Sequence, residues 1–183
     1  YRNVVVSGMG GSAIGGDILR VYAAKKARVP VIVVRDYNIP AFVDQHTLFL
    51  AASYSGNTEE TLSAYSQARE QGASIICVTT GGKLKAMAEK DGYGVVEIPT
   101  GLVPRAATGY LFAPLALLLE ELGIVEGVRQ ELQETIEVLR GMREELHPGV
   151  RDARDADRQV EPRTRRPHRR DQAQRRDREE DRR

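Results

Sequence analysis

The chain has 183 residues, which is enough for one domain with a hydrophobic core and short for two. It is 41% hydrophobic and 29% charged, and its formal net charge is +1. Residues 1–146 contain 17 acidic and 14 basic residues, so this part gives no sign of a nucleic-acid surface. The longest apolar stretch, residues 111–119, is too short for a membrane span and contains Pro114.

The last part of the chain has a different composition. Residues 151–183 contain 13 arginines and nine acidic residues, and almost no apolar side chains. Such a segment buries too little surface to offset the entropy lost on ordering, so we predict that residues 147–183 are disordered. The composition is typical of out-of-frame translation of GC-rich DNA, and we interpret the tail as frame-shifted and non-native. The alternative is a natural basic tail that binds an acidic partner.

The apolar residues predict alternating strands and helices. In chain order the pattern predicts a strand at residues 3–7, a helix at 13–26, strands at 30–34 and 48–52, a helix at 59–71, a strand at 74–79, a helix at 83–90, a strand at 94–98, and helices at 106–122 and 126–146. Alternation of this kind favours a parallel sheet covered on both faces. We therefore predict a three-layer αβα, flavodoxin-like domain with five parallel strands over residues 1–146.

Some of these elements carry more specific expectations. The first helix is predicted from the spacing of Ile14, Ile18, Leu19 and Tyr22, and the last has one apolar face made of Val128, Leu132, Ile136, Leu139 and Met142. The lone Cys77 lies in an apolar strand, and a single buried thiol favours a reducing compartment such as the cytoplasm. The chain enters a strand directly after Tyr1, which we interpret as a piece of a longer protein.

A glycine-rich loop follows the first strand, with the sequence Gly8-Met9-Gly10-Gly11-Ser12-Ala13. Glycines at a strand-to-helix turn allow the backbone to approach a ligand, and the helix N-terminus offers unpaired N–H groups to an anion. Two other interpretations remain open. The glycines could serve only the turn, or the pattern could be a relaxed dinucleotide fingerprint with Asp36 at the ribose.

A hydroxyl-rich loop follows the third strand and places Ser53, Ser55 and Thr58 around Gly56. Each hydroxyl could donate to a phosphate oxygen, with helix N–H groups completing the site. The loop has no P-loop lysine, which argues against a nucleoside triphosphate. A purely structural alternative is a capping box formed by Asn57 and Glu60, but this explains only part of the pattern.

Together the two loops resemble the signatures of the sugar isomerase (SIS) domain family. The run from Gly8 to Asp17 and the run from Ser53 to Thr61 match its two signatures, and the stretch from Pro99 to Tyr110 resembles a third. More narrowly, these strings resemble the bifunctional phosphoglucose/phosphomannose isomerases. The resemblance implies an aldose–ketose isomerase of hexose 6-phosphates, without metal or cofactor, that assembles from paired SIS domains and as a homodimer.

The resemblance also implies roles for individual residues. Ser53, Ser55 and Thr58 would bind the phosphate, and the loop of Gly11 and Ser12 would contact the sugar. Arg105 would stabilise the enediolate formed during isomerisation. A guanidinium suits that task because negative charge builds on oxygen when a proton leaves the neighbouring carbon.

The groups that move the proton are not found in this sequence. In the resembled family the general base and the ring-opening group belong to a second SIS domain, and His46, His147 and His168 are poor substitutes. We therefore expect this chain to bind sugar phosphate and to be inactive by itself. Besides a dinucleotide-binding domain, the alternative is a regulatory SIS module that senses a sugar phosphate without catalysis.

Overall fold

The computed structural model describes residues 1–146, apart from the side chains of Pro104 and Arg105. The chain divides into two compact units, one from Tyr1 to Thr135 and one that begins at Ile136. The disordered, frame-shifted tail expected over residues 147–183 lies outside the described residues.

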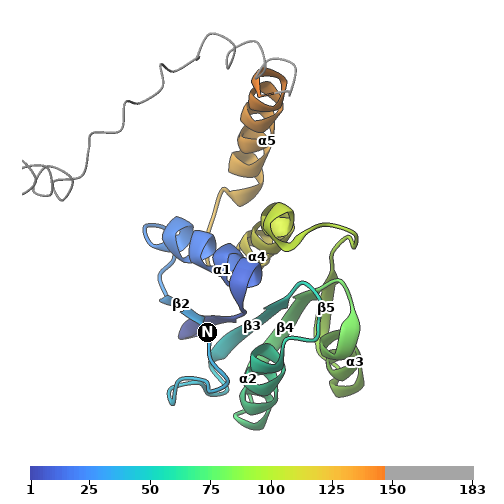
Figure 1. Cartoon of the computed structure of the whole chain (residues 1–183). Coiled ribbons are helices and arrows are strands. Elements are labelled where there is room, and N and C mark those ends of the chain that lie inside the picture. Colours follow the sequence, from blue (N-terminus) through green and yellow to red (C-terminus); the bar gives the residue numbers. More distant parts are fainter. Residues whose placement is uncertain (147–183) are drawn as a thin grey trace, which may run out of the picture. The chain divides into compact units, whose positions relative to one another are not determined.

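The first unit is built on a five-stranded parallel sheet, as predicted (Figure 1). Its strands are β1 (Asn3–Ser7), β2 (Val31–Val34), β3 (Thr47–Ser53), β4 (Ser74–Thr79) and β5 (Gly94–Glu97). Their order across the sheet is β2-β1-β3-β4-β5, which is the flavodoxin-like order of a doubly wound domain. All five predicted strands are confirmed to within a residue or two at each end.

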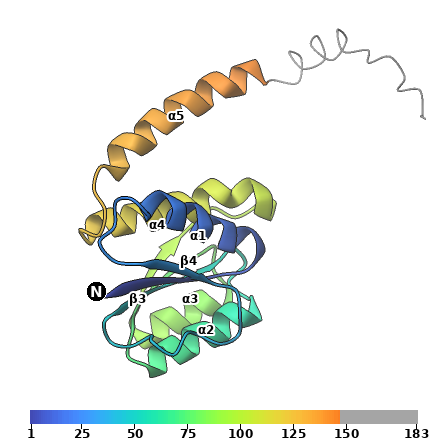
Figure 2. The same cartoon turned by 90° about the vertical axis from the view of Figure 1, so that its left-hand side faces the viewer.

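Helices cover both faces of the sheet, which confirms the three-layer prediction. Figure 2 shows α1 (Gly10–Ala23) and α4 (Thr108–Glu121) on one face, and α2 (Glu59–Glu70) and α3 (Gly82–Asp91) on the other. A short 3-10 helix, η1 (Pro104–Ala107), precedes α4, and α5 (Val128–Glu145) follows it.

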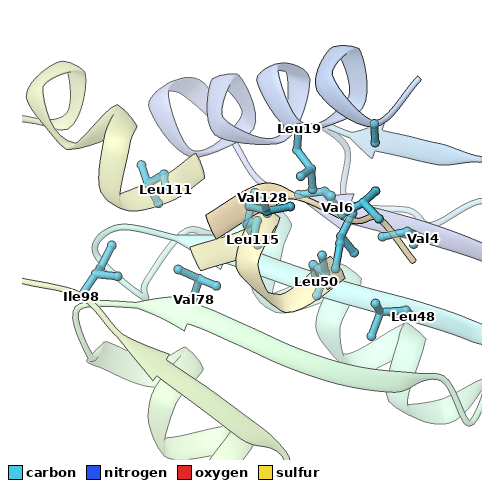
Figure 3. Close-up of a cluster of buried hydrophobic side chains, with 14 of the residues drawn as sticks. Val4, Val6, Leu19, Leu48, Leu50, Val78, Ile98, Leu111, Leu115 and Val128 are labelled. Carbon is cyan, nitrogen blue, oxygen red and sulfur yellow. The ribbon is translucent and has the colours of Figure 1, made fainter. Parts of the chain in front are cut away.

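Side chains along each strand alternate between two cores, because successive residues of a strand point to opposite faces of the sheet. Val4, Val6 and Leu50 face α1 and α4, where they pack with Leu19 and Leu115 (Figure 3). Their neighbours Val5, Phe49 and Ala51 belong to the second core, under α2 and α3. Every residue of β3 is buried, since this central strand has neighbours on both sides and helices on both faces.

Helix α1 turns a different face to the core than its bulky residues suggest. Of the four residues that predicted this helix, Ile14 and Ile18 are exposed, whereas Leu19 is buried and Tyr22 packs against the core. The other buried residues are Ser12, Ala13, Gly15, Gly16 and Ala23. The physical reason is close packing. A Cβ on Gly15 would lie 2.6 Å from the Leu111 carbonyl oxygen, and one on Gly16 would lie 2.9 Å from Val6 Cγ1. The glycines therefore bring α1 against α4 and β1, and the isoleucines are left on the outside.

The last two helices differ in the burial of their apolar residues. In α4, Leu111, Leu115 and Leu119 are buried, whereas Tyr110 and the C-cap residue Leu122 are exposed. In α5 the expected apolar face begins with the buried Val128. Farther along it, Ile136, Leu139 and Met142 are exposed.

Cys77 is buried in β4, as predicted, and is a free thiol. Burial raises its pKa to about 12, because the thiolate would lose its hydration there. Among residues 1–146, every helix is too short or too polar to span a membrane.

The close contact between α1 and α4 can be tested with Gly15→Ala. The added Cβ meets a backbone oxygen that can move only if the helices separate, so we expect the free energy of unfolding to fall by about 1–3 kcal/mol. The control is Gly109→Ala in the first turn of α4, where a Cβ meets nothing within 4 Å. This variant should be neutral or stabilised by up to about 1 kcal/mol. Urea unfolding followed by circular dichroism measures both, and equal effects would contradict the packing argument.

Candidate functional site

The two loops singled out in the sequence lie side by side at one edge of the sheet. β1 and β3 are neighbouring parallel strands, with Ser7 opposite Ala51, so the loops that follow them leave the sheet together. In the sheet, β2 lies on one side of β1 and β3 lies on the other, so the direction in which successive strands are added reverses after β2. Ligands of doubly wound sheets bind at this point of reversal, beyond the carboxyl ends of the strands.

This strand order also weakens the dinucleotide alternative. The dinucleotide-binding fold has the order 3-2-1-4-5-6, whereas here β3 lies directly beside β1. The Arg35 side chain, next to the expected ribose ligand Asp36, forms an ion pair with Asp17 of α1.

A hydrogen bond joins the two loops. The Tyr54 amide donates to Ser12 Oγ over 3.1 Å, and Ser12 is almost fully buried in the first turn of α1. Gly8 makes the approach sterically feasible, since a Cβ there would lie 2.9 Å from the Ala52 carbonyl oxygen. Gly11 is half-buried beside Ser12. The structure therefore brings Gly11 and Ser12 next to the hydroxyl loop, as their proposed role requires.

Inside the hydroxyl loop, Ser53 and Thr58 form a pair. Their hydroxyl oxygens are 2.9 Å apart, and the Gly56 amide donates to Ser53 Oγ over 3.1 Å. Ser53 is only 1% exposed, whereas Thr58 is half-buried. When Ser53 donates to Thr58, the Thr58 hydroxyl hydrogen is free to point outward. Ser53 is thus placed to orient Thr58, which can itself reach a ligand.

Ser55 lies on the exposed rim of the same loop. Its Oγ accepts a hydrogen bond from the Asn57 amide over 3.2 Å, which fixes the oxygen and leaves the hydroxyl hydrogen available for a ligand. Of the three hydroxyls singled out in the sequence, Ser55 is the one whose side chain meets solvent most directly.

The N-terminus of α2 completes the loop. The N-cap residue is Thr58, and its side chain makes no capping hydrogen bond. The capping box predicted as an alternative for Asn57 and Glu60 is therefore wrong. The first N–H groups of a helix have no acceptor within the helix and carry a partial positive charge. Together with Thr58 and Ser55, they form a set of donors suited to a phosphate or similar oxyanion.

A third loop, which the sequence analysis did not assign to the site, supports the hydroxyl loop from behind. This loop follows β4, and its Gly81 leads into Gly82, the first residue of α3. The Leu84 amide donates to the Gly56 carbonyl over 2.9 Å, and the Lys83 amide donates to Asn57 Oδ1 over 3.1 Å. The signal available in the sequence was the glycine pair after the fourth strand, since carboxyl ends of parallel strands share one edge.

Arg105 belongs to η1, which follows β5 at the same edge of the sheet; its side chain is not among those described. His46 directly precedes β3 and so lies at the opposite edge, as expected. Among residues 1–146, no group of three or more His, Cys, Asp or Glu side chains is placed to hold a metal ion.

The contact between Gly56 and the supporting loop can be tested by mutation. Gly56 has a φ of +67°, and a Cβ on it would lie 1.8 Å from the Gly81 carbonyl oxygen. We expect Gly56→Ala to lower the free energy of unfolding by about 3 kcal/mol or more, from backbone strain and steric overlap together. Gly72→Ala is the matched control, because Gly72 has a φ of +75° but its Cβ would meet only Gln45 Cβ, at 4.0 Å. It should lose only about 1–2 kcal/mol. Thermal or urea unfolding that gave equal losses would refute the steric contact.

The chain is similar in sequence to several curated proteins. The bifunctional phosphoglucose/phosphomannose isomerase of Caldicellulosiruptor bescii is 59% identical over 133 residues, which cover 73% of this chain and 39% of that protein. The D-glucosamine-6-phosphate 4-epimerase of Sulfolobus acidocaldarius is 39% identical over 121 residues, covering 66% of this chain and 38% of that protein. The chain thus spans about two fifths of the length of these curated relatives.

The fold recurs in a solved structure of low sequence identity. The tagatose-6-phosphate ketose/aldose isomerase from Escherichia coli superposes with a TM-score of 0.57 and 16% identity, over 77% of this chain and 42% of that one. The family model for the SIS domain matches residues 1–94, which contain both the glycine-rich loop and the hydroxyl loop. The chain therefore belongs to the SIS domain family.

Proposed function

We propose that this chain supplies the phosphate-binding half of an aldose–ketose isomerase that interconverts glucose 6-phosphate or mannose 6-phosphate with fructose 6-phosphate. One observation carries the proposal. The hydroxyl loop is ordered by its own hydrogen bonds around the uncapped N-terminus of α2, so its donors are arranged before a ligand arrives. A site arranged in advance loses little entropy on binding.

The phosphate would lie against the N-terminus of α2. In this arrangement Ser55 and Thr58 donate their hydroxyl hydrogens to phosphate oxygens, and the first N–H groups of the helix complete the contact. Ser53 contributes by orienting Thr58, since it is buried behind it. The hexose chain would then extend over Gly11 and Ser12, whose turn lies beside this loop.

Arg105 would act on the reacting end of the sugar. Isomerisation removes a proton from the carbon next to the carbonyl, and negative charge collects on the two oxygens of the resulting enediolate. A guanidinium held there stabilises the charge, and its planar set of donors can meet both oxygens at once. The η1 helix, which carries Arg105, follows β5 at the same edge as the phosphate-binding loop.

The proton-transferring groups would come from a part of the relatives that this chain does not match. The only histidine among the described residues, His46, lies at the opposite edge of the sheet. We propose that a second SIS domain supplies the base and the ring-opening group, and that the assembly acts in the cytoplasm. Full turnover of glucose 6-phosphate by the purified chain alone would contradict this division of roles.

A second candidate is a module that binds a hexose phosphate without changing it. No histidine lies near the hydroxyl loop among the described residues, which favours this alternative. One relative is named as an isomerase and another as an epimerase, and both names contain a phosphorylated sugar. The similarity therefore supports a phosphorylated sugar as the ligand more strongly than it supports either reaction.

Ligand titration tests the proposed site. By calorimetry or NMR, glucose 6-phosphate and fructose 6-phosphate should bind, and free glucose should bind far more weakly. Ser55→Ala should weaken phosphate-ester binding by about ten- to a hundredfold, which corresponds to losing a hydrogen bond to a charged group. The control is Ser66→Ala, because the Ser66 hydroxyl only donates to the Leu62 carbonyl inside α2. Equal affinity for glucose and its phosphate would refute the site.

Pairing with another SIS domain has its own test. Ile14, Ile18 and Val21 are 49%, 39% and 66% exposed, and their spacing places them on one face of α1. We expect this face to drive self-association of the chain, visible as a concentration-dependent mass in light scattering. Ile18→Glu should reduce it, whereas Phe42→Glu, at an exposed position in the loop between β2 and β3, should not. A monomeric wild-type chain at every concentration would count against the pairing.

A further inference from the structure

Tyr54 connects four loops at the edge of the sheet where the candidate site lies. Its amide donates to Ser12 Oγ in the loop after β1, and its carbonyl accepts hydrogen bonds from the amide and hydroxyl of Thr80 in the loop after β4. Its side chain reaches the loop after β5. There the hydroxyl donates to the Pro99 carbonyl over 3.1 Å and accepts from the Leu102 amide over 2.9 Å.

The segment held by this hydroxyl is largely exposed. Leu102 and Val103 are 37% and 54% exposed, so they contribute little packing. Gly101 has a φ of +85°, and a Cβ on it would meet nothing within 4 Å. The Tyr54 hydroxyl oxygen bonds to Pro99 at one end of this loop and to Leu102 at the other, so it holds the two ends together.

The anchored amide of Leu102 is close to Arg105 along the chain, and the backbone between them is stiff. Val103 precedes Pro104, which restricts it to extended backbone, and its angles are φ −68° and ψ 143°. The ring of Pro104 fixes its own φ, and η1 begins at that residue. Few free torsions therefore separate the Tyr54 contact from the backbone of Arg105.

We propose that Tyr54 is a positioning residue: its hydroxyl holds the loop of residues 99–103, and with it the backbone that leads into Arg105, in the place required for Arg105 to act on a sugar whose phosphate is bound by the same hydroxyl loop. The inference rests on the proposed function, because it assigns Arg105 to the enediolate. Tyr54 lies between Ser53 and Ser55 in the chain. One short segment would therefore form the phosphate site and, through its tyrosine hydroxyl, fix the backbone next to Arg105.

A pair of ligands isolates the contribution of Arg105. D-Arabinonate 5-phosphate carries a carboxylate that imitates the two oxygens and the charge of the enediolate, and D-arabinitol 5-phosphate has the same phosphate and chain without that charge. The wild-type chain should bind the carboxylate about tenfold more tightly than the alditol, through a charge-assisted contact with Arg105. Arg105→Ala should abolish this preference.

Tyr54→Phe should lose most of the preference for the carboxylate while its affinity for the alditol phosphate changes less than about twofold, because the phenol oxygen touches neither phosphate donor. The double variant Tyr54→Phe/Arg105→Ala should show no further loss of preference than Arg105→Ala alone, as residues acting through one another are not additive. Amide hydrogen exchange at Leu102 should accelerate in Tyr54→Phe. Tyr65→Phe is the control, since it removes a tyrosine hydroxyl that donates from α2 to Asp91 at the end of α3, over 2.8 Å.

The outcomes separate this inference from the proposed function. If the wild-type chain binds neither phosphate ester, the proposed function fails, and the role of Tyr54 fails with it. If the wild-type chain binds and prefers the carboxylate but Tyr54→Phe keeps that preference, the inference about Tyr54 alone is overturned. Unchanged exchange at Leu102 in Tyr54→Phe, or full additivity in the double variant, overturns it as well.

Discussion

The candidate site depends on a close backbone approach between two loops that are 25 residues apart in the chain. Gly56 lies against the carbonyl of Gly81, and a Cβ on Gly82 would lie 2.5 Å from the Ser55 carbonyl oxygen. Side chains at these positions would force the loops apart. Because the loops touch, backbone amides after β4 can donate to the Gly56 carbonyl and to Asn57, and the hydroxyl loop is held from behind. Its outward side is left to Ser55, Thr58 and the N-terminus of α2.

This construction lets the loop accept an anion without a permanent positive charge of its own. Glu59 and Glu60 occupy the first turn of α2, where they interact favourably with the helix dipole. A bound phosphate would meet hydroxyl and amide donors on a neutral loop beside two carboxylates. Binding would therefore rely on the number and direction of its hydrogen bonds.

The glycines near the start of α1 have two separate uses. Gly8, in the turn before α1, allows the close approach to the Ala52 carbonyl next to the hydroxyl loop, whereas Gly15 and Gly16 let the helix pack closely against α4 and β1. The second use has a consequence for the surface. Since the glycine side of α1 is the buried side, Ile14 and Ile18 face outward and leave an apolar stripe on the surface of the unit.

Much of the fold and part of the site could be predicted from the sequence. The apolar runs determined five strands and the helices between them, because strand and helix periodicity is a local property of the chain. The positions of Ser12, Ser55 and Thr58 at one edge followed from the same pattern, since parallel strands place their carboxyl ends together. Composition alone also separated residues 151–183 from the rest.

Only the tertiary structure decided which side of α1 is buried, that Ser53 lies behind Thr58, and that Tyr54 joins four loops. Each of these depends on a contact between segments far apart in the chain, such as Gly15 with Leu111 or Tyr54 with Leu102. The local pattern of the sequence shows only which residues are apolar and how they are spaced. How closely two backbones approach, and which hydroxyl meets which amide, is set by the packing of elements that the local pattern does not relate to one another.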